Sequence, residues 1–132
     1  MSDRYKHNEG CVYNIKYHLV WCPKYRKEVL TGEIASRLKQ VLGMKAKELG
    51  IDLEAIEVMP DHVHVFVTGQ PTEAIQHIVN QLKGASSRIL RSEFAVLRAK
   101  LPCLWSRSYY CGTVGYMSEA AIRKYIEGQK GK

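Results

Sequence analysis

Two histidines separated by one residue are the clearest chemical feature of the sequence. His62 and His64 lie in the segment 60–67 (PDHVHVFV), whose alternating valines predict a β-strand over residues 62–67. Side chains alternate across a strand, so both imidazoles should share one face, with their Cα atoms roughly 6.6 Å apart. Such a pair can bind one metal ion, although a polar pair without a metal would give the same tripeptide. A metal site therefore needs a third ligand and a reactive group elsewhere in the chain.

The segments around the histidines predict an antiparallel sheet. Residues 51–59 form a second apolar strand, and the short turn Pro60-Asp61 should pair it antiparallel with the histidine strand. Aromatic residues predict a further strand over 104–111. Residues 12–22 predict the first strand, because a polar face with Lys16 and His18 alternates with an apolar face made of Tyr13, Ile15, Tyr17, Leu19 and Trp21.

Three helices should connect and follow these strands. An apolar stripe predicts one helix from Thr31 to Leu49, ended by Gly50, and a second begins after Thr72 and reaches residue 91 or beyond. Residues 94–100 can continue as a helix. The last helix spans about 117–130 and places Tyr125 and Gln129 on one side.

This order of elements predicts the fold class. It is an α+β fold of the ferredoxin-like or RRM-like βαββαβ plan, an antiparallel sheet with helices on one face, plus the C-terminal tyrosine helix. At 132 residues the chain should form one domain, residues 1–132.

Composition favours a nucleic acid partner and a cytoplasmic location. The net charge is +7 and the isoelectric point is near 9.3, which suits a polyanion. The four cysteines, at positions 11, 22, 103 and 111, show no C-x-x-C spacing, and the chain begins without an apolar signal core. We therefore expect reduced thiols in the cytoplasm and no membrane span.

Several cations are candidates for contacts with a DNA backbone. Lys24 and Arg26 follow the first strand, and Arg107 lies near the last one. Lys83, Arg88 and Arg91 form a stripe on the second long helix. A solvated charged face would produce the same pattern.

Three segments together resemble a known family. They are residues 20–26 (VWCPKYR), residues 59–64 (MPDHVH) and residues 123–129 (RKYIEGQ). In this order the chain resembles the single-tyrosine HUH transposases of small bacterial insertion sequences that move as single-stranded DNA. The resemblance spans nearly the whole chain.

The resemblance implies a role for each candidate residue. His62 and His64 would hold a divalent cation, Gln129 would supply a further ligand, and Tyr125 would be the nucleophile that forms a 5′-phosphotyrosine link. A phenol has a pKa near 10, so it attacks a phosphodiester poorly without such a cation. Two imidazoles and an amide oxygen leave open positions that suit Mg²⁺ or Mn²⁺, as the resemblance also implies. No nucleotide cofactor is needed, and Asp61 should point away from both histidines.

The resemblance also implies the partners. They are single-stranded DNA hairpins at the ends of a mobile element and a second copy of the chain, whose tyrosine helix could complete the metal site. Two alternatives remain: a domesticated relative that cuts chromosomal repeat hairpins, and a non-catalytic RRM-like module that binds single strands. The module would not need His62, His64 or Tyr125, and the chain lacks the aromatic run typical of such modules.

Overall fold

The main body of the protein is an antiparallel sheet. The computed structural model describes residues 6–8, 11–13, 15–69, 74–113 and 119–129. Within these residues, a four-stranded sheet has the order β4-β5-β3-β6, every neighbouring pair being antiparallel. Its strands are β3 (Ile15–Trp21), β4 (Asp52–Met59), β5 (His62–Gly69) and β6 (Tyr110–Thr113). The short strands β1 (Lys6–Asn8) and β2 (Cys11–Tyr13) pair separately.

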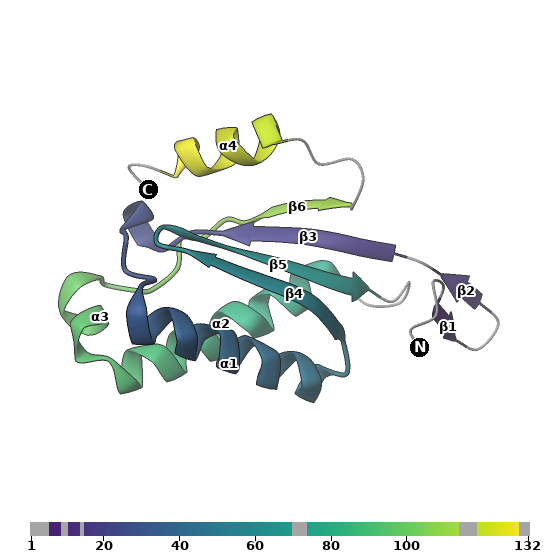
Figure 1. Cartoon of the computed structure of the whole chain (residues 1–132), viewed down its shortest axis with the longest axis horizontal. Coiled ribbons are helices and arrows are strands. Elements are labelled where there is room, and N and C mark those ends of the chain that lie inside the picture. Colours follow the sequence, from purple (N-terminus) through teal and green to yellow (C-terminus); the bar gives the residue numbers. More distant parts are fainter. Residues whose placement is uncertain (1–5, 9–10, 14, 70–73, 114–118, 130–132) are drawn as a thin grey trace.

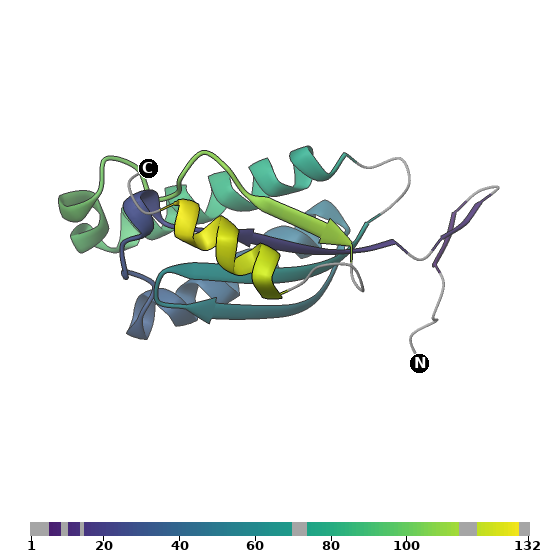
Figure 2. The same ribbon diagram turned by 90° about the horizontal axis from the view of Figure 1, so that it is seen from above.

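Helices lie on both sides of this sheet (Figures 1 and 2). Helices α1 (Gly32–Leu49) and α2 (Ile75–Glu93) cover one face, and the short α3 (Ala95–Lys100) follows α2 after a break at Phe94. Helix α4 (Glu119–Gly128) lies over the opposite face. The ferredoxin-like α+β prediction is therefore confirmed, with the last helix as an addition. In the described part of the chain, no helix has both the length and the apolar character needed to cross a membrane.

The hydrophobic core lies between the sheet and helices α1 and α2. From β5, Val63, Val65 and Val67 are fully buried there, and Leu19 and Trp21 join them from β3. Burying these five side chains fixes the register of the sheet, because a slip of one residue would expose all of them. The residues between them on β3 and β5 must therefore face α4.

Some predicted boundaries shift. Helix α1 ends where expected, at Gly50 in the left-handed conformation (φ 72°), but Thr31 makes no side-chain capping bond. The predicted cap Thr72 and the flanks 117–118 and 130 of the last helix lie outside the described residues. The predicted strand over 12–22 is divided between β2 and β3.

The predicted strand over 104–111 begins only at Tyr110. The segment before it is held by other contacts, since Trp105 forms an isolated bridge with Pro23 and the Ser106 N–H donates to Cys22 O over 3.0 Å. Leu104, Trp105 and Ser106 are all buried by this packing. The aromatic pattern there reflects burial of an irregular segment.

Candidate active site

The two motif histidines lie side by side at the start of β5. Their ring centroids are 4.8 Å apart, with an angle of 69° between the rings. Both are partly buried, whereas Val63 between them is fully buried on the other face. The alternation predicted from the sequence thus holds, and both imidazoles lie on the face away from α1 and α2.

Each histidine uses its Nδ1 atom for an orienting hydrogen bond. His62 Nδ1 donates to Asp61 Oδ1 over 2.7 Å, and His64 Nδ1 lies 2.7 Å from Nε2 of His18. A neutral imidazole that donates from Nδ1 carries its lone pair on Nε2. In that tautomer Nε2 of both motif histidines has a free lone pair that could bind a metal ion.

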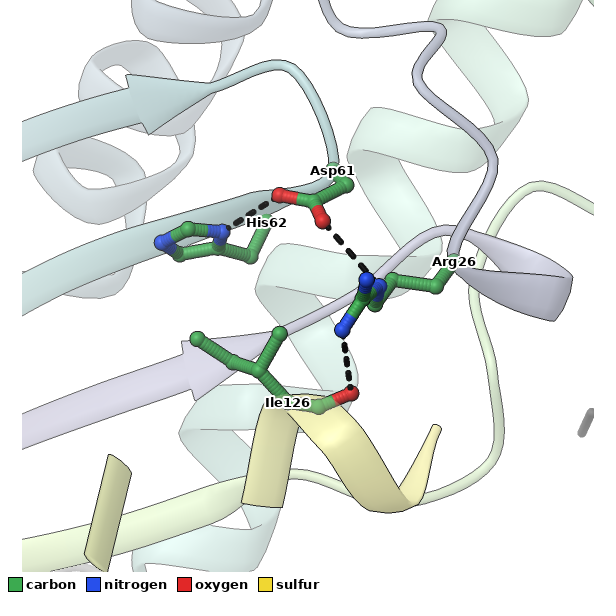
Figure 3. Close-up of polar contacts among 4 residues, drawn as sticks. All are labelled: Arg26, Asp61, His62 and Ile126. Carbon is green, nitrogen blue, oxygen red and sulfur yellow. Dashed lines mark hydrogen bonds and ion pairs between the residues drawn. The ribbon is translucent and has the colours of Figure 1, made fainter. Parts of the chain in front are cut away.

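Asp61 does not point away from the histidines, contrary to the expectation from strand alternation. Strand β5 begins at His62, as predicted, so Asp61 belongs to the turn after β4 and strand alternation does not apply to it. Its Oδ1 accepts from His62, and its Oδ2 lies 3.1 Å from Arg26 Nε (Figure 3). Asp61 is therefore an orienting partner of His62.

His18 is a part of the site that our reading of the sequence missed. It is only 3% exposed and stacks on Phe66, with ring centroids 4.3 Å apart. Its pKa falls to about 4, chiefly because burial disfavours the charged ring and also because His64 is adjacent, while Glu57 opposes the shift. The pKa of His64 is lowered for the same first reason. His18 is thus neutral near pH 7 and can accept a hydrogen bond from His64.

Tyr125 lies on α4 with its phenol partly buried. Its hydroxyl donates to Ser108 O over 3.0 Å, and its ring centroid is 6.4 Å from that of Tyr110. Burial raises the pKa of the Tyr125 phenol, and the Ser108 hydroxyl, whose oxygen lies 3.4 Å from the phenolic oxygen, only partly opposes this shift. The neutral phenol predominates at pH 7, so nucleophilic attack requires a positive group that stabilises developing charge.

Gln129, directly after α4, has an orphaned acceptor. The residue is 5% exposed, and its Oε1 has no hydrogen-bond partner among the described residues. A buried unpaired amide oxygen costs about 1–3 kcal/mol. Amide oxygens are suitable ligands for hard divalent cations, so this atom fits the predicted role of a metal ligand.

The donor set bears on which metal would fit. Among the residues that the structure describes, no three His, Cys, Asp or Glu side chains are grouped to hold a metal ion. His62, His64 and Gln129 would instead give two nitrogens and one oxygen, which leave open positions. The residues present are thus compatible with Mg²⁺ or Mn²⁺.

The predicted DNA-contacting cations differ in whether they are engaged by the protein itself. Lys83 Nζ donates to the carbonyls of Ser106 (2.7 Å) and Ser108 (3.3 Å), and Arg91 donates to Leu101 O over 2.8 Å. Both residues therefore anchor the segment 101–108. Arg88 and Arg107 are exposed, and Lys24 is partly exposed with its Nζ 5.3 Å from the centre of the Tyr25 ring. Arg26 pairs with Asp61, as described above.

Comparisons with known proteins identify the family. The model of IS200-like transposases matches residues 11–129. The ISDra2 transposase TnpA of Deinococcus radiodurans is 44% identical over 129 residues, which cover 96% of this chain and 92% of that protein. The transposase of insertion sequence element IS200 from Salmonella typhimurium is 32% identical over 119 residues, covering 89% and 78%. These matches place the protein in the class of DNA transposases. Within that class, the chain belongs to the IS200-like family.

Solved structures agree with this assignment. The crystal structure of a candidate transposase from Deinococcus radiodurans R1 has a TM-score of 0.89 and 42% identity, with 96% of this chain and 99% of that chain covered. A REP-associated tyrosine transposase, solved with a REP hairpin, has a TM-score of 0.56 at 12% identity and covers 96% of this chain and 69% of its own. The second likeness shows a shared fold.

Proposed function

We propose that this transposase cuts and rejoins single-stranded DNA at the ends of an insertion sequence, with Tyr125 as the nucleophile. His62, His64 and Gln129 would hold Mg²⁺ or Mn²⁺. The observation that carries this proposal is the chain of contacts from His62 through Asp61 and Arg26 to the backbone of α4, which brings the tyrosine helix to the histidine turn (Figure 3).

The residues of the chain prepare this reaction. Asp61 and His18 hold the two imidazoles in the tautomer that binds a metal. A bound divalent cation would polarise the scissile phosphate and offset its negative charge. The Ser108 carbonyl holds the phenolic proton of Tyr125, so the hydroxyl must release this bond before it attacks.

The covalent step is a balanced exchange. The Tyr125 oxygen forms a bond to phosphorus and loses its proton, while the bond from phosphorus to the 3′ oxygen breaks and that oxygen gains a proton. The DNA is then joined to Tyr125 through its 5′ phosphate, with a free 3′ hydroxyl on the other fragment. One phosphodiester replaces another, so the reverse step can rejoin strands without a nucleotide cofactor.

The substrate would be a folded single strand with a hairpin. Lys24, Arg88 and Arg107 are the cations best placed to contact its phosphates, because their side chains reach solvent. The 44% and 32% identities are to insertion-sequence transposases, so they favour a mobile element over the repeat-hairpin alternative. Two copies of the chain would act together as a homodimer.

The test is a search for a covalent adduct. Purified protein is mixed with Mn²⁺ and labelled single-stranded DNA that carries the palindromes neighbouring its gene. We expect an adduct that survives SDS and links protein to the 5′ phosphate. Tyr125→Phe should bind this DNA and form no adduct, and His64→Ala should behave the same way. An adduct that persists in Tyr125→Phe would move the nucleophile to another residue.

A further inference from the structure

The turn η1 (Lys24–Arg26) has an unusual backbone. Tyr25 and Arg26 have φ values of 60° and 53°, and they are the only residues other than glycine with positive φ in the described part of the chain. Bulky side chains rarely adopt this conformation. Tyr25 is 46% exposed, so burial of its ring does not explain the strain. Strained backbone of this kind is often associated with function.

The strained turn directs Arg26 toward the site (Figure 3). Its Nε lies 3.1 Å from Asp61 Oδ2, and its terminal NH1 group donates to Ile126 O over 3.4 Å. The other oxygen of Asp61 accepts from His62 Nδ1. One guanidinium thus joins a metal-binding histidine, through its carboxylate partner, to the helix that carries Tyr125.

We propose that Arg26 is a positioning residue that holds the tyrosine helix α4 in register with His62. The metal part of this inference rests on the proposed function. Ile126 lies in the last turn of α4, where a cation is favoured by the helix dipole. Its carbonyl accepts from the Gln129 N–H over 3.1 Å, and Arg26 is a second donor to the same oxygen. Only a planar guanidinium offers two separate donors in fixed geometry, so lysine cannot replace it.

A competing role for Arg26 is a direct contact with a DNA phosphate. A phosphate contact predicts no change in α4 when Arg26 is replaced in the protein without DNA. The positioning role predicts a change, because the Ile126 carbonyl loses the Arg26 donor when the guanidinium is removed. The two roles can therefore be separated without DNA, metal or catalysis.

The first experiment measures amide hydrogen exchange of α4 in protein without metal or DNA. We expect Arg26→Ala and Arg26→Lys to speed exchange in residues 119–128 about tenfold, with α1 and α2 unchanged. Lys27→Ala is the matched control, since Lys27 is an exposed cation in the same region; it should exchange like the wild type. Unchanged exchange in Arg26→Ala would by itself overturn the positioning role. Weaker DNA binding with a lower salt dependence in the same variant would then favour the phosphate contact.

The second experiment measures Mn²⁺ binding by the loss of the free-ion electron paramagnetic resonance signal. Arg26→Ala and Asp61→Ala should each weaken binding about tenfold, as expected for partners of a metal-binding histidine. The double variant should be no weaker than Asp61→Ala, because Arg26 acts through Asp61. Additive losses of Mn²⁺ affinity in the double variant would show that Arg26 does not act through Asp61. If the wild type binds no Mn²⁺, the proposed metal chemistry fails, whereas the exchange experiment still decides whether Arg26 holds α4.

Discussion

At the scale of single residues, Gln129 combines a structural cost with a proposed metal-binding role. Its buried Oε1 has no hydrogen-bond partner among the described residues. Gln129→Leu keeps the approximate shape and removes the unpaired atom. In metal-free protein we expect equal stability or a gain of up to about 1 kcal/mol in urea denaturation. Mn²⁺ affinity should fall about tenfold or more.

Gln129→Glu is the control for this prediction. It keeps an oxygen at the same position and adds a negative charge, so it should bind Mn²⁺ at least as well as the wild type. Unchanged Mn²⁺ affinity in Gln129→Leu would remove Gln129 from the set of ligands. A clear loss of stability in the metal-free variant would show that the amide has a partner in the folded protein.

Lys83 gives a prediction about pH. Its pKa is lowered to about 8, first because burial disfavours the ammonium, with Cys22 and Cys103 opposing. Between about pH 8 and the ordinary lysine pKa near 10.4 the unfolded chain binds more protons, so this residue makes stability rise with pH. Below pH 8 both states are charged, and the penalty is constant.

The measurement compares the wild type with Lys83→Met by urea denaturation at pH 7.5 and pH 10. The wild type should gain about 1 kcal/mol relative to the variant over this range, after allowance for solvent screening of a partly exposed group. The comparison is needed because the pKa of the Cys22 thiol is raised to about 12, which lowers stability above pH 9 in both proteins. Arg88→Met, which removes an exposed cation from the same helix, should show no such trend. A constant difference for Lys83→Met would contradict the lowered pKa.

At the scale of the elements, strand β6 contains a glycine, Gly112, beside the side chain of Tyr110. A Cβ on Gly112 would lie 2.7 Å from the Tyr110 hydroxyl, so Tyr110 would have to move. We expect Gly112→Ala to destabilise the protein by about 1–2 kcal/mol through overpacking. In a Tyr110→Ala background the cost should fall below about 0.5 kcal/mol, because the clash is gone. Equal costs in both backgrounds would rule out this explanation.

At the same scale, several features of the strands and helices were predictable from the sequence. Alternation in residues 62–67 was enough to place the valines in the core and the histidines opposite, and Gly50 correctly ended α1. His18 could have been found, because a core face containing Leu19 and Trp21 puts His18 on the face of His64 once β3 and β5 pair. The shared face of His18 and His64 was therefore predictable. Their distance was not, because it depends on the pairing register of β3 and β5, for which the sequence contains no pattern.

Other features depend on tertiary contacts of irregular segments. Lys83 and Arg91 have the spacing of a solvated stripe, yet backbone carbonyls of the segment 101–108 accept their hydrogen bonds. Asp61 lies in the predicted turn Pro60-Asp61, where strand alternation does not apply, and its contacts with His62 and Arg26 depend on the folded turn. Long-range partners of loops are specified by packing, which periodicity does not report.

At the scale of the whole molecule, the sheet separates stability from chemistry. One face is covered by α1 and α2 and contains the core, whereas α4 lies over the other (Figure 1). The histidines lie on this second face, opposite the buried Val63 and Val65. Helix α4 adds to a sheet whose core is complete without it, and its described polar contacts with the rest of the chain involve few residues, among them Arg26 and Ser108. An element outside the core can exchange between two identical copies and make the same contacts in the partner.

The last prediction follows from this possibility of exchange. His64→Ala retains Tyr125 but lacks one of the proposed metal ligands. Tyr125→Phe retains the histidines but lacks the proposed nucleophile, so each should be inactive alone. In a dimer of one copy of each, exchanged helices would give one site with both functions. We expect such heterodimers to form the covalent adduct at about half the wild-type level, since one of two sites is complete.

The measurement requires heterodimers that are purified with two different tags and shown to bind DNA. The adduct should form on the His64→Ala subunit, because only that subunit has the tyrosine, and a size difference between the subunits would reveal this. Arg26 of the subunit with intact histidines would then hold the exchanged helix, so adding Arg26→Ala to the Tyr125→Phe subunit should reduce the adduct, whereas the same change in the other subunit should not. If heterodimers bind DNA and stay inactive, each site must use its own tyrosine, as in the single chain, or cleavage must need both sites intact.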